Sequence, residues 1–338
     1  MSDYDFIIVG AGSAGSALAN RLSKDSDKRV LLLEAGGPDS HPWLRVPMGY
    51  GKVFYDKRVN WKYTTEPNET LDGNRIYWPR GKVMGGSNSI NAMVYVRGHP
   101  QDYDHWAKDA PGWSWTDVAP VFKRMENWLG AANPDRGSDG PLTVRDIADD
   151  AHPLCANYLT AAEQAGFAYN PDYNSGQMEG AALYQITTKN GLRASAARAY
   201  ITPIQHRSNL TLALRAHVQK LCFEGRKVTG VRYLQKGQLK TAHARAEVIL
   251  CSGAINSPQL LQLSGIGPGA LLQAHNIPVV QDMPQVGRNL KDHLGADLHY
   301  RSKVQTLNQV LRPLSGKIKV ALQYLFTRSG PLSLSLNQ

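Results

Sequence analysis

The sequence predicts an α/β protein built on a doubly wound βαβ sheet with an antiparallel β insertion. The prediction starts from residues 5–10 (DFIIVG), a short β-branched run that ends at a glycine and is typical of a buried strand. Residues 13–25 carry apolar side chains at helical spacing, and residues 29–36 (RVLLLEAG) form a second continuous apolar run. Continuous rather than alternating apolarity indicates parallel strands covered on both faces. Strand, helix and strand within this length make a βαβ unit.

Composition is that of an ordinary globular protein. The chain has 338 residues, of which 42% are apolar and 20% are charged. No apolar stretch is long enough for a transmembrane helix, and the first ten residues contain two aspartates and no basic residue, unlike a secretory signal. We therefore expect a cytoplasmic protein. The three cysteines are far apart with no CxxC pair, so we expect neither a metal site nor a disulfide framework.

Positive charge gathers at the end of the chain. The net charge is +10, and no acidic residue follows Asp297. The six bases after it are scattered among leucines rather than interleaved with stacking aromatic residues, so we expect no nucleic-acid binding. We interpret this tail as part of a domain whose acidic half is absent. The six are Arg301, Lys303, Arg312, Lys317, Lys319 and Arg328.

The rest of the chain alternates long loops with a few regular elements. Residues 41–81 are rich in Gly, Pro and aromatic residues, and loops of this length are usually functional. The antiparallel insertion is predicted at about 210–250, and a helix is predicted to begin after it with Ser257 as N-cap and Pro258 in the first turn. Further helices are expected near 101–109, 115–128, 153–165 and 316–327.

The turn after the first strand carries a dinucleotide-binding pattern. Gly10, Gly12 and Gly15 form GxGxxG: the first permits the tight turn, the second lets the backbone approach a pyrophosphate, and the third lets the helix pack closely. The N–H groups around Ser13 and Ala14 open the helix and would face the anion. Glu34, followed by Ala35, ends the next strand and can accept hydrogen bonds from ribose hydroxyls, which disfavours NADP. This context favours a Rossmann-like dinucleotide site over a plain glycine turn.

Three longer blocks narrow the choice of nucleotide. Residues 81–98 (GKVMGGSNSINAMVYVRG), 253–267 (GAINSPQLLQLSGIG) and 286–293 (VGRNLKDH) follow the glycine motif in order. Together they resemble the glucose–methanol–choline family of FAD-dependent alcohol oxidoreductases over essentially the whole chain. Met84 and Asn88 depart mildly from the first block, where the family usually has a branched apolar residue and a small residue.

The resemblance implies a set of FAD contacts. Gly86, with its neighbour Gly85, would lie close against the cofactor, and Val218 would contact the adenine, although an ordinary strand valine is an equal alternative. Some relatives carry a histidine bonded to the flavin where this chain has Ile90, so the FAD is expected to be noncovalent. The positions matching the flavin contacts are Val83, Asn91, Ala92, Met93 and Val94.

The resemblance also implies a reaction and a domain plan. In the family, a base takes the hydroxyl proton of an alcohol while hydride passes to the flavin, and histidine suits that base. No histidine of this chain matches the family's catalytic motif, so no catalytic residue is assigned and the chain resembles an amino-terminal fragment. We expect an FAD-binding domain over 1–297, with cofactor-wrapping loops over 40–100, and the truncated start of an α+β substrate-binding domain over 298–338.

Several expectations about partners depend on that resemblance. Primary alcohols would be the substrates, and electrons would pass to a quinone or another acceptor, which could place the protein at the periphery of the inner membrane. Exposed apolar surface would cause poor solubility or self-association, so the oligomeric state is left open. The alternatives are a catalytically inert FAD-binding fragment, an NAD-dependent Rossmann dehydrogenase and, least favoured, a nucleic-acid-binding protein.

Overall fold

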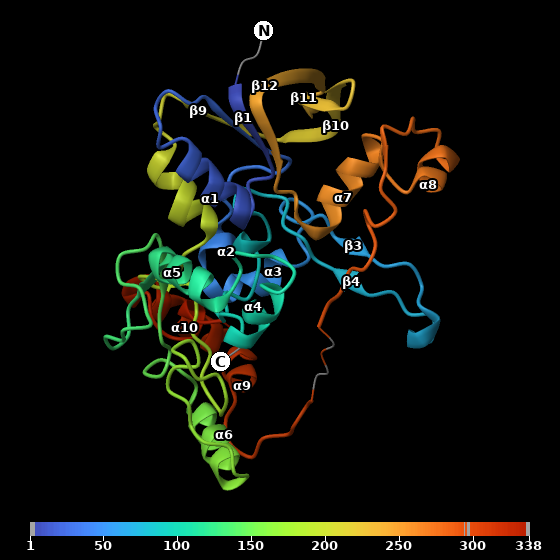
Figure 1. Ribbon diagram of the computed structural model, residues 1–338. Coiled ribbons are helices and arrows are strands. Elements are labelled where there is room, and N and C mark those ends of the chain that lie inside the picture. Colours follow the sequence, from blue (N-terminus) through green and yellow to red (C-terminus); the bar gives the residue numbers. More distant parts are fainter. Residues whose placement is uncertain (1–3, 294, 296–297, 336–338) are drawn as a thin grey trace. The chain divides into compact units, whose positions relative to one another are not determined.

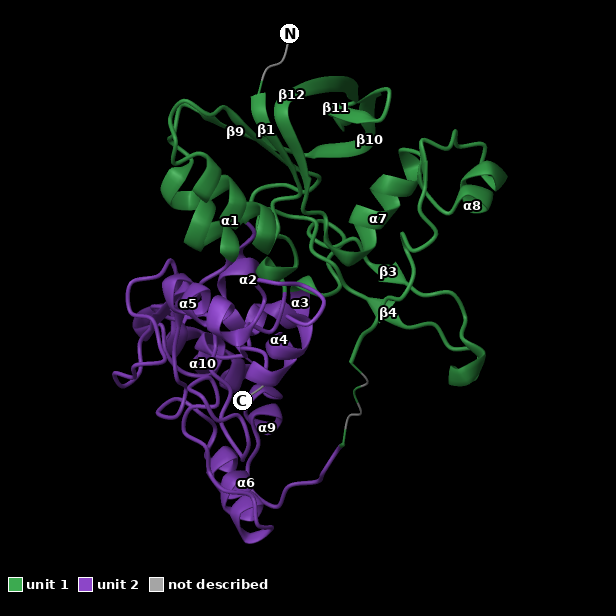
Figure 2. Cartoon of the chain, viewed as in Figure 1, with its two compact units in different colours: residues 1–40, 53–90, 196–298 green, residues 41–52, 91–195, 299–338 purple. Residues whose placement is uncertain are grey.

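The computed structural model describes residues 4–293, 295 and 298–335. The chain forms two compact units, each assembled from separate stretches of sequence (Figure 2). Unit 1 comprises residues 1–40, 53–90 and 196–298, and unit 2 comprises residues 41–52, 91–195 and 299–338. The units are defined by internal contacts, so the functional domains over 1–297 and 298–338 stay predictions. Their expected boundary, at Asp297, lies outside the described residues.

Unit 1 is built on a six-stranded sheet with the strand order β10-β11-β12-β1-β2-β9. The strands next to β1 and β2 are parallel, with Ile7 opposite Val248 on one side and Leu31 on the other. The chain passes from β1 through α1 to β2, which confirms the predicted βαβ unit (Figure 1). The elements are β1 (Tyr4–Val9), α1 (Ser13–Leu22), β2 (Val30–Glu34), β9 (Leu210–Leu214), β10 (Ala216–Glu224), β11 (Lys227–Gln235) and β12 (Gln238–Leu250).

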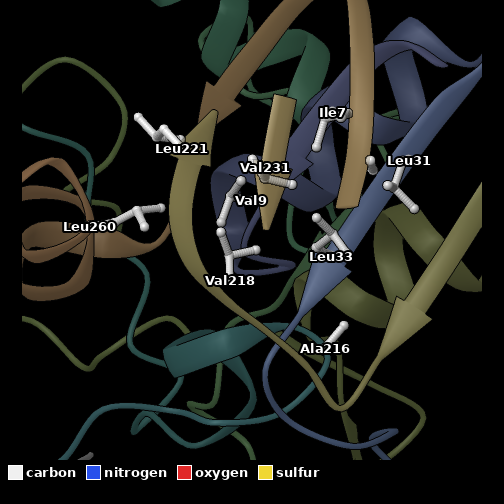
Figure 3. Packing of buried hydrophobic residues seen from close by; sticks show 10 residues of the cluster. Ile7, Val9, Leu31, Leu33, Ala216, Val218, Leu221, Val231 and Leu260 are labelled. Carbon is white, nitrogen blue, oxygen red and sulfur yellow. The ribbon is translucent and has the colours of Figure 1, made fainter. Parts of the chain in front are cut away.

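The central strands are buried on both faces, as their unbroken apolar sequences predict. Ile8 and Leu32 pack with Ala19 of α1 in one apolar cluster. Ile7 and Leu33 point to the other face, where they join a second cluster (Figure 3). Because successive side chains of a strand alternate between faces, a strand with cover on both sides must be apolar at every position.

The antiparallel insertion is smaller than predicted. β10, β11 and β12 pair antiparallel, but β9 pairs parallel with β2, with Leu32 opposite Leu212. The prediction that the insertion starts at about 210 is therefore wrong for β9. Arg215, between β9 and β10, has φ +52°, a left-handed conformation that turns the chain out of one strand and into the next. β12 serves both arrangements, since its first half pairs with β11 and its second half with β1.

The helix after the insertion begins earlier than predicted. α7 spans Gly253–Leu263, so Ser257 lies inside it and is not its N-cap. The Ser257 hydroxyl instead accepts a hydrogen bond from the backbone N–H of Ser252, at 3.1 Å. Pro258 is accommodated inside the helix rather than in its first turn. Unit 1 also contains β3 (Tyr63–Thr64), η2 (Glu69–Leu71), β4 (Tyr77–Trp78), η3 (Gly86–Ser89), η4 (Ala197–Ile201), η5 (Thr202–Ile204), β13 (Ile266–Gly267), α8 (Gly269–Ala274) and β14 (Gln281–Asp282).

Unit 2 consists of helices and short strands joined by long loops, and it contains the four further helices that the sequence predicts, although the helix predicted over 115–128 ends at Met125 and its last three residues form β5 instead. Within the described residues, no helix combines the length and apolarity needed to cross a bilayer. The elements are α2 (Pro42–Arg45), η1 (Pro47–Gly49), α4 (Pro100–Trp106), α5 (Trp115–Met125), β5 (Glu126–Trp128), β6 (Leu142–Val144), α6 (Pro153–Gln164), β7 (Thr188–Lys189), β8 (Leu192–Arg193), α9 (Leu307–Leu311), α10 (Leu314–Thr327) and η6 (Pro331–Ser333); α3 (Tyr50–Val53) ends at the boundary with unit 1.

Candidate functional site

Unit 1 contains a cavity of about 830 Å³ at the carboxyl ends of its parallel strands. Val9, Leu33 and Leu250, which lie at or next to the ends of β1, β2 and β12, line it. Open α/β sheets bind ligands at this edge. Eight of the residues predicted from the sequence line the cavity: Gly10, Gly12, Ser13, Ala14, Glu34, Ala35, Gly86 and Val218.

The three motif positions favour glycine for different structural reasons. Gly10 has φ +101°, which favours glycine. A methyl group at Gly15 would lie 1.9 Å from the carbonyl oxygen of Gly10, so Gly15 serves the close packing of α1 and does not itself line the cavity. A methyl group at Gly12 would meet no described protein atom closer than the Cys251 carbonyl oxygen at 4.0 Å. Packing within the protein therefore does not require glycine at position 12, whereas a ligand lying against the backbone would.

Glu34 is a buried carboxylate that the backbone holds in place. Glu34 is only 6% exposed. One oxygen accepts from the N–H of Ala11 at 2.9 Å and the other from the N–H of Gly36 at 2.8 Å. Burial raises the pKa of Glu34, and these two hydrogen bonds oppose the rise. Each carboxylate oxygen has a further lone pair, so the residue can still accept hydrogen bonds from a ligand in the cavity.

The glycine-rich loop at 85–86 lies directly against the start of α1. A methyl group at Gly86 would lie 2.8 Å from the Cα of Gly12, and the Gly85 N–H donates to the Ala11 carbonyl at 2.7 Å. Gly85 and Gly86 have φ of +92° and +57°. The two glycine motifs are far apart in sequence and form one wall of the cavity together. Val83 is fully buried, forms a bridge with Gly37 and does not line the cavity.

One wall of the cavity carries aromatic and basic residues that were not predicted individually from the sequence. Trp61, Arg80 and His217 line the cavity. The Lys82 ammonium lies 4.3 Å from the Trp61 ring centroid, and the His217 ring lies 5.4 Å from it. Burial, with Lys82 nearby, lowers the pKa of His217. The only signal in the sequence was the unusual density of aromatic residues in the long loop over 41–81.

Val218 has two environments. Its side chain lies among Val9, Leu33 and Val231 in the apolar cluster of this face (Figure 3). The residue also lines the cavity at the start of β10. Its side chain therefore packs as that of an ordinary core valine. Its position at the cavity wall is also compatible with the predicted contact to a ligand.

The remaining predicted residues lie in unit 2 and do not line the cavity of unit 1. Asn91, Ala92 and Met93 form a tight turn in which the Asn91 Oδ1 accepts from the Met93 N–H at 3.0 Å. Met93 is buried and has φ +64°, a strained conformation for a residue with a side chain. Val94 follows and pairs with Ile186 in an isolated bridge.

Known proteins resemble this chain over most of its length. Residues 4–295 match the family described as GMC oxidoreductase. "Alcohol dehydrogenase [acceptor]" of Pseudomonas putida is 44% identical over 337 residues, which cover 98% of this chain and 60% of the relative. "Oxygen-dependent choline dehydrogenase" of Vibrio vulnificus is 42% identical over 330 residues, covering 97% of this chain and 59% of the relative.

A solved structure gives the same result for the fold. The FAD-dependent oxidoreductase from Chaetomium thermophilum superposes with a TM-score of 0.89 at 27% sequence identity, covering 98% of this chain and 60% of that one. The chain thus spans about 60% of the length of these relatives. The family match extends over more than half of the sequence and includes both glycine loops of the cavity. This chain belongs to the GMC oxidoreductase family.

Proposed function

We propose that the chain binds FAD in the cavity of unit 1 and is the cofactor-binding part of an oxidoreductase that acts on the CH–OH group of alcohols. The observation that carries the proposal is the pair of glycine loops at Gly12 and Gly86, which meet at one wall of a cavity of about 830 Å³. That volume lies within the range of roughly 300–1,000 Å³ typical of small-molecule and cofactor sites.

The residues present fit the parts of a dinucleotide. The start of α1 offers backbone N–H groups at Ser13 and Ala14, and the first turn of that helix carries no acidic side chain that would repel a pyrophosphate. Arg80 also lines this cavity and brings a positively charged residue to its wall. Glu34 is suited to accept hydrogen bonds from ribose hydroxyls, and its charge disfavours a 2′-phosphate.

We assign the flavin end of FAD to the block over residues 81–98. We propose that Val218 contacts the adenine. The proposed flavin contacts are Val83, Asn91, Ala92, Met93 and Val94. We further propose that the flavin is held noncovalently. Ile90 is buried, and an aliphatic side chain cannot form a bond to the flavin.

Bound FAD would supply the acceptor for the hydride that leaves the carbinol carbon. This chain's own residues bind and orient the cofactor, and none of them is assigned as the base that takes the hydroxyl proton. Primary alcohols are the proposed substrates, and a quinone or another compound is the proposed acceptor, with peripheral membrane association through it. The relatives' names support alcohol oxidation but differ on the acceptor, since one reads "[acceptor]" and the other "oxygen-dependent".

The test is a titration of the purified chain with FAD, followed by incubation with a panel of primary alcohols and an acceptor dye. Flavin absorbance bands that stay with the protein are the expected result. Because no residue of this chain is assigned as the base, we expect no alcohol-dependent dye reduction by this chain alone, and such reduction would show that the chain carries a base of its own. Binding of NAD in place of FAD would overturn the proposal.

A further inference from the structure

The turn formed by Asn91, Ala92 and Met93 is held by a buried arginine from a distant part of unit 2. Arg193, at the end of β8, is 3% exposed. Its Nη1 donates to the Asn91 Oδ1 at 2.8 Å, and its Nη2 donates to the Asn91 carbonyl oxygen at 2.7 Å. Its Nε donates to the carbonyl oxygen of Leu44 at 3.2 Å, which anchors the guanidinium to α2. The planar guanidinium thus donates to both the side chain and the main chain of Asn91.

These hydrogen bonds fix which way the Asn91 amide faces. Its Oδ1 accepts from both Arg193 and the Met93 N–H, so the amide oxygen must occupy that position and the Nδ2 group must face the other way. Neither Asn91 Nδ2 nor the Ala92 N–H has a hydrogen-bond acceptor among the residues that the structure describes. The turn therefore presents two neighbouring donors that the protein does not use.

The backbone of this turn needs such support. Met93 has φ +64° with its side chain buried, a conformation that persists only when its surroundings enforce it. The Met93 carbonyl oxygen accepts from the Thr187 N–H at 2.9 Å, which holds the turn from its other end. Burial lowers the pKa of Arg193 to about 9, which leaves the guanidinium charged at neutral pH.

We propose that Arg193 is a positioning residue that fixes Asn91 and Ala92 as hydrogen-bond donors to the flavin. The inference rests on the proposed function, which assigns this turn to the flavin. Polar edge atoms of the flavin are acceptors that such a pair of donors suits. The buried positive charge also favours a more negative flavin, so the reduced form should be stabilised and the reduction potential raised.

The experiment compares FAD affinity and flavin reduction potential in the 338-residue chain and its variants. Arg193→Met is expected to raise the FAD Kd about tenfold, the size expected when one or two hydrogen bonds are lost, and to lower the reduction potential. Arg193→Lys keeps the positive charge but lacks the planar guanidinium with its several donors. It should therefore restore part of the lost reduction potential and a smaller part of the lost FAD affinity. Arg145→Met is the matched control, because Arg145 in the same unit bonds Thr188 and Asp150 rather than Asn91. Its FAD affinity and potential should equal those of the wild type.

A double-mutant cycle distinguishes positioning from general support of the fold. If Arg193 acts through Asn91, Arg193→Met combined with Asn91→Leu should bind FAD no more weakly than the weaker single variant. Additive losses would overturn the proposal. Should Arg193→Met fail to fold, Asn91→Asp decides, since it keeps an acceptor for Arg193 and Met93 but replaces the Nδ2 donor. Wild-type FAD affinity and potential in folded Asn91→Asp would overturn the proposal, whereas failure of the wild type itself to bind FAD would reject the proposed function instead.

Discussion

Replacing two motif glycines with alanine should separate ligand contact from protein packing. At Gly15 the added methyl would lie 1.9 Å from the Gly10 carbonyl oxygen, against an ordinary contact distance of 3.4–4 Å. The clash is with backbone, which cannot rotate away, so overpacking should cost about 1–3 kcal/mol or more. Helix propensity favours alanine by about 1 kcal/mol and offsets only part of this cost. Because an approach of 1.9 Å to backbone is severe, the upper end of that cost applies, and about 3 less about 1 kcal/mol leaves a net loss of about 2 kcal/mol in the free energy of unfolding.

At Gly12 the same methyl meets no described atom closer than 4.0 Å, and φ of −71° suits alanine. Gly12→Ala should therefore leave the free energy of unfolding within about 0.5 kcal/mol of the wild type. It should nevertheless weaken FAD binding at least about tenfold, because a cofactor against the backbone would meet the new side chain. Urea denaturation without FAD gives the stabilities, and quenching of flavin fluorescence gives the Kd values. Gly12→Ala with unchanged FAD affinity would refute the assignment of the pyrophosphate to this turn.

Three further predictions follow from other parts of the chain. Because burial raises the pKa of Glu34 above its ordinary 4.5, the folded protein retains a proton that the unfolded chain releases. The contribution of Glu34 to stability is therefore fully present below pH 4.5 and is lost as pH rises through the raised pKa. Urea unfolding over this range should show a free energy of unfolding that falls with rising pH, and Glu34→Gln should reduce this slope. The same slope in Glu34→Gln would contradict the prediction. Acid precipitation of the FAD-loaded protein should leave the yellow colour in the supernatant, and colour in the pellet would reject noncovalent binding. On α10, Leu314 is 73% exposed and Phe326 79%, so exchanging both for serine should shift the chain from associated species toward monomer in light scattering; no change in mass would show that this face does not drive association.

Local patterns predicted the first part of the fold well. Residues 5–34 contain the strand, the glycine turn, the helix and the second strand in one continuous segment, so their hydrophobic periodicity and turn chemistry alone define the βαβ unit. The cavity contacts within that segment, such as Gly12 and Glu34, were predictable for the same reason.

Long-range pairing was harder to predict. The apolar sequence of β9 reads equally well as an antiparallel or a parallel strand, and the left-handed Arg215 that separates it from β10 carries no sequence signal comparable to a glycine. Trp61 and His217 reach the cavity from segments far apart in sequence. The aromatic density of the loop over 41–81 points to that loop but does not single out Trp61, and no local pattern marks His217. Ser257 was misplaced because a Ser-Pro pair resembles a helix start, whereas α7 begins four residues earlier at Gly253.

The Arg193 contacts show the same limit. Its hydrogen bonds to Asn91 join residues 102 positions apart, and a lone arginine in a polar loop gives no reason to expect burial. Only the fold brings the guanidinium to the strained turn at Met93.

The most direct test of FAD binding in the unit 1 cavity is competition at equilibrium. The purified chain is loaded with FAD and titrated separately with ADP and with FMN, while flavin fluorescence and the protein-bound fraction are followed. The glycine turn, Glu34 and Val218 assign the adenosine and pyrophosphate to this cavity, so ADP should displace FAD and FMN, which lacks the adenosine half, should displace it much less. Displacement by FMN as strong as that by ADP, or no retention of FAD at all, would contradict this account of the site.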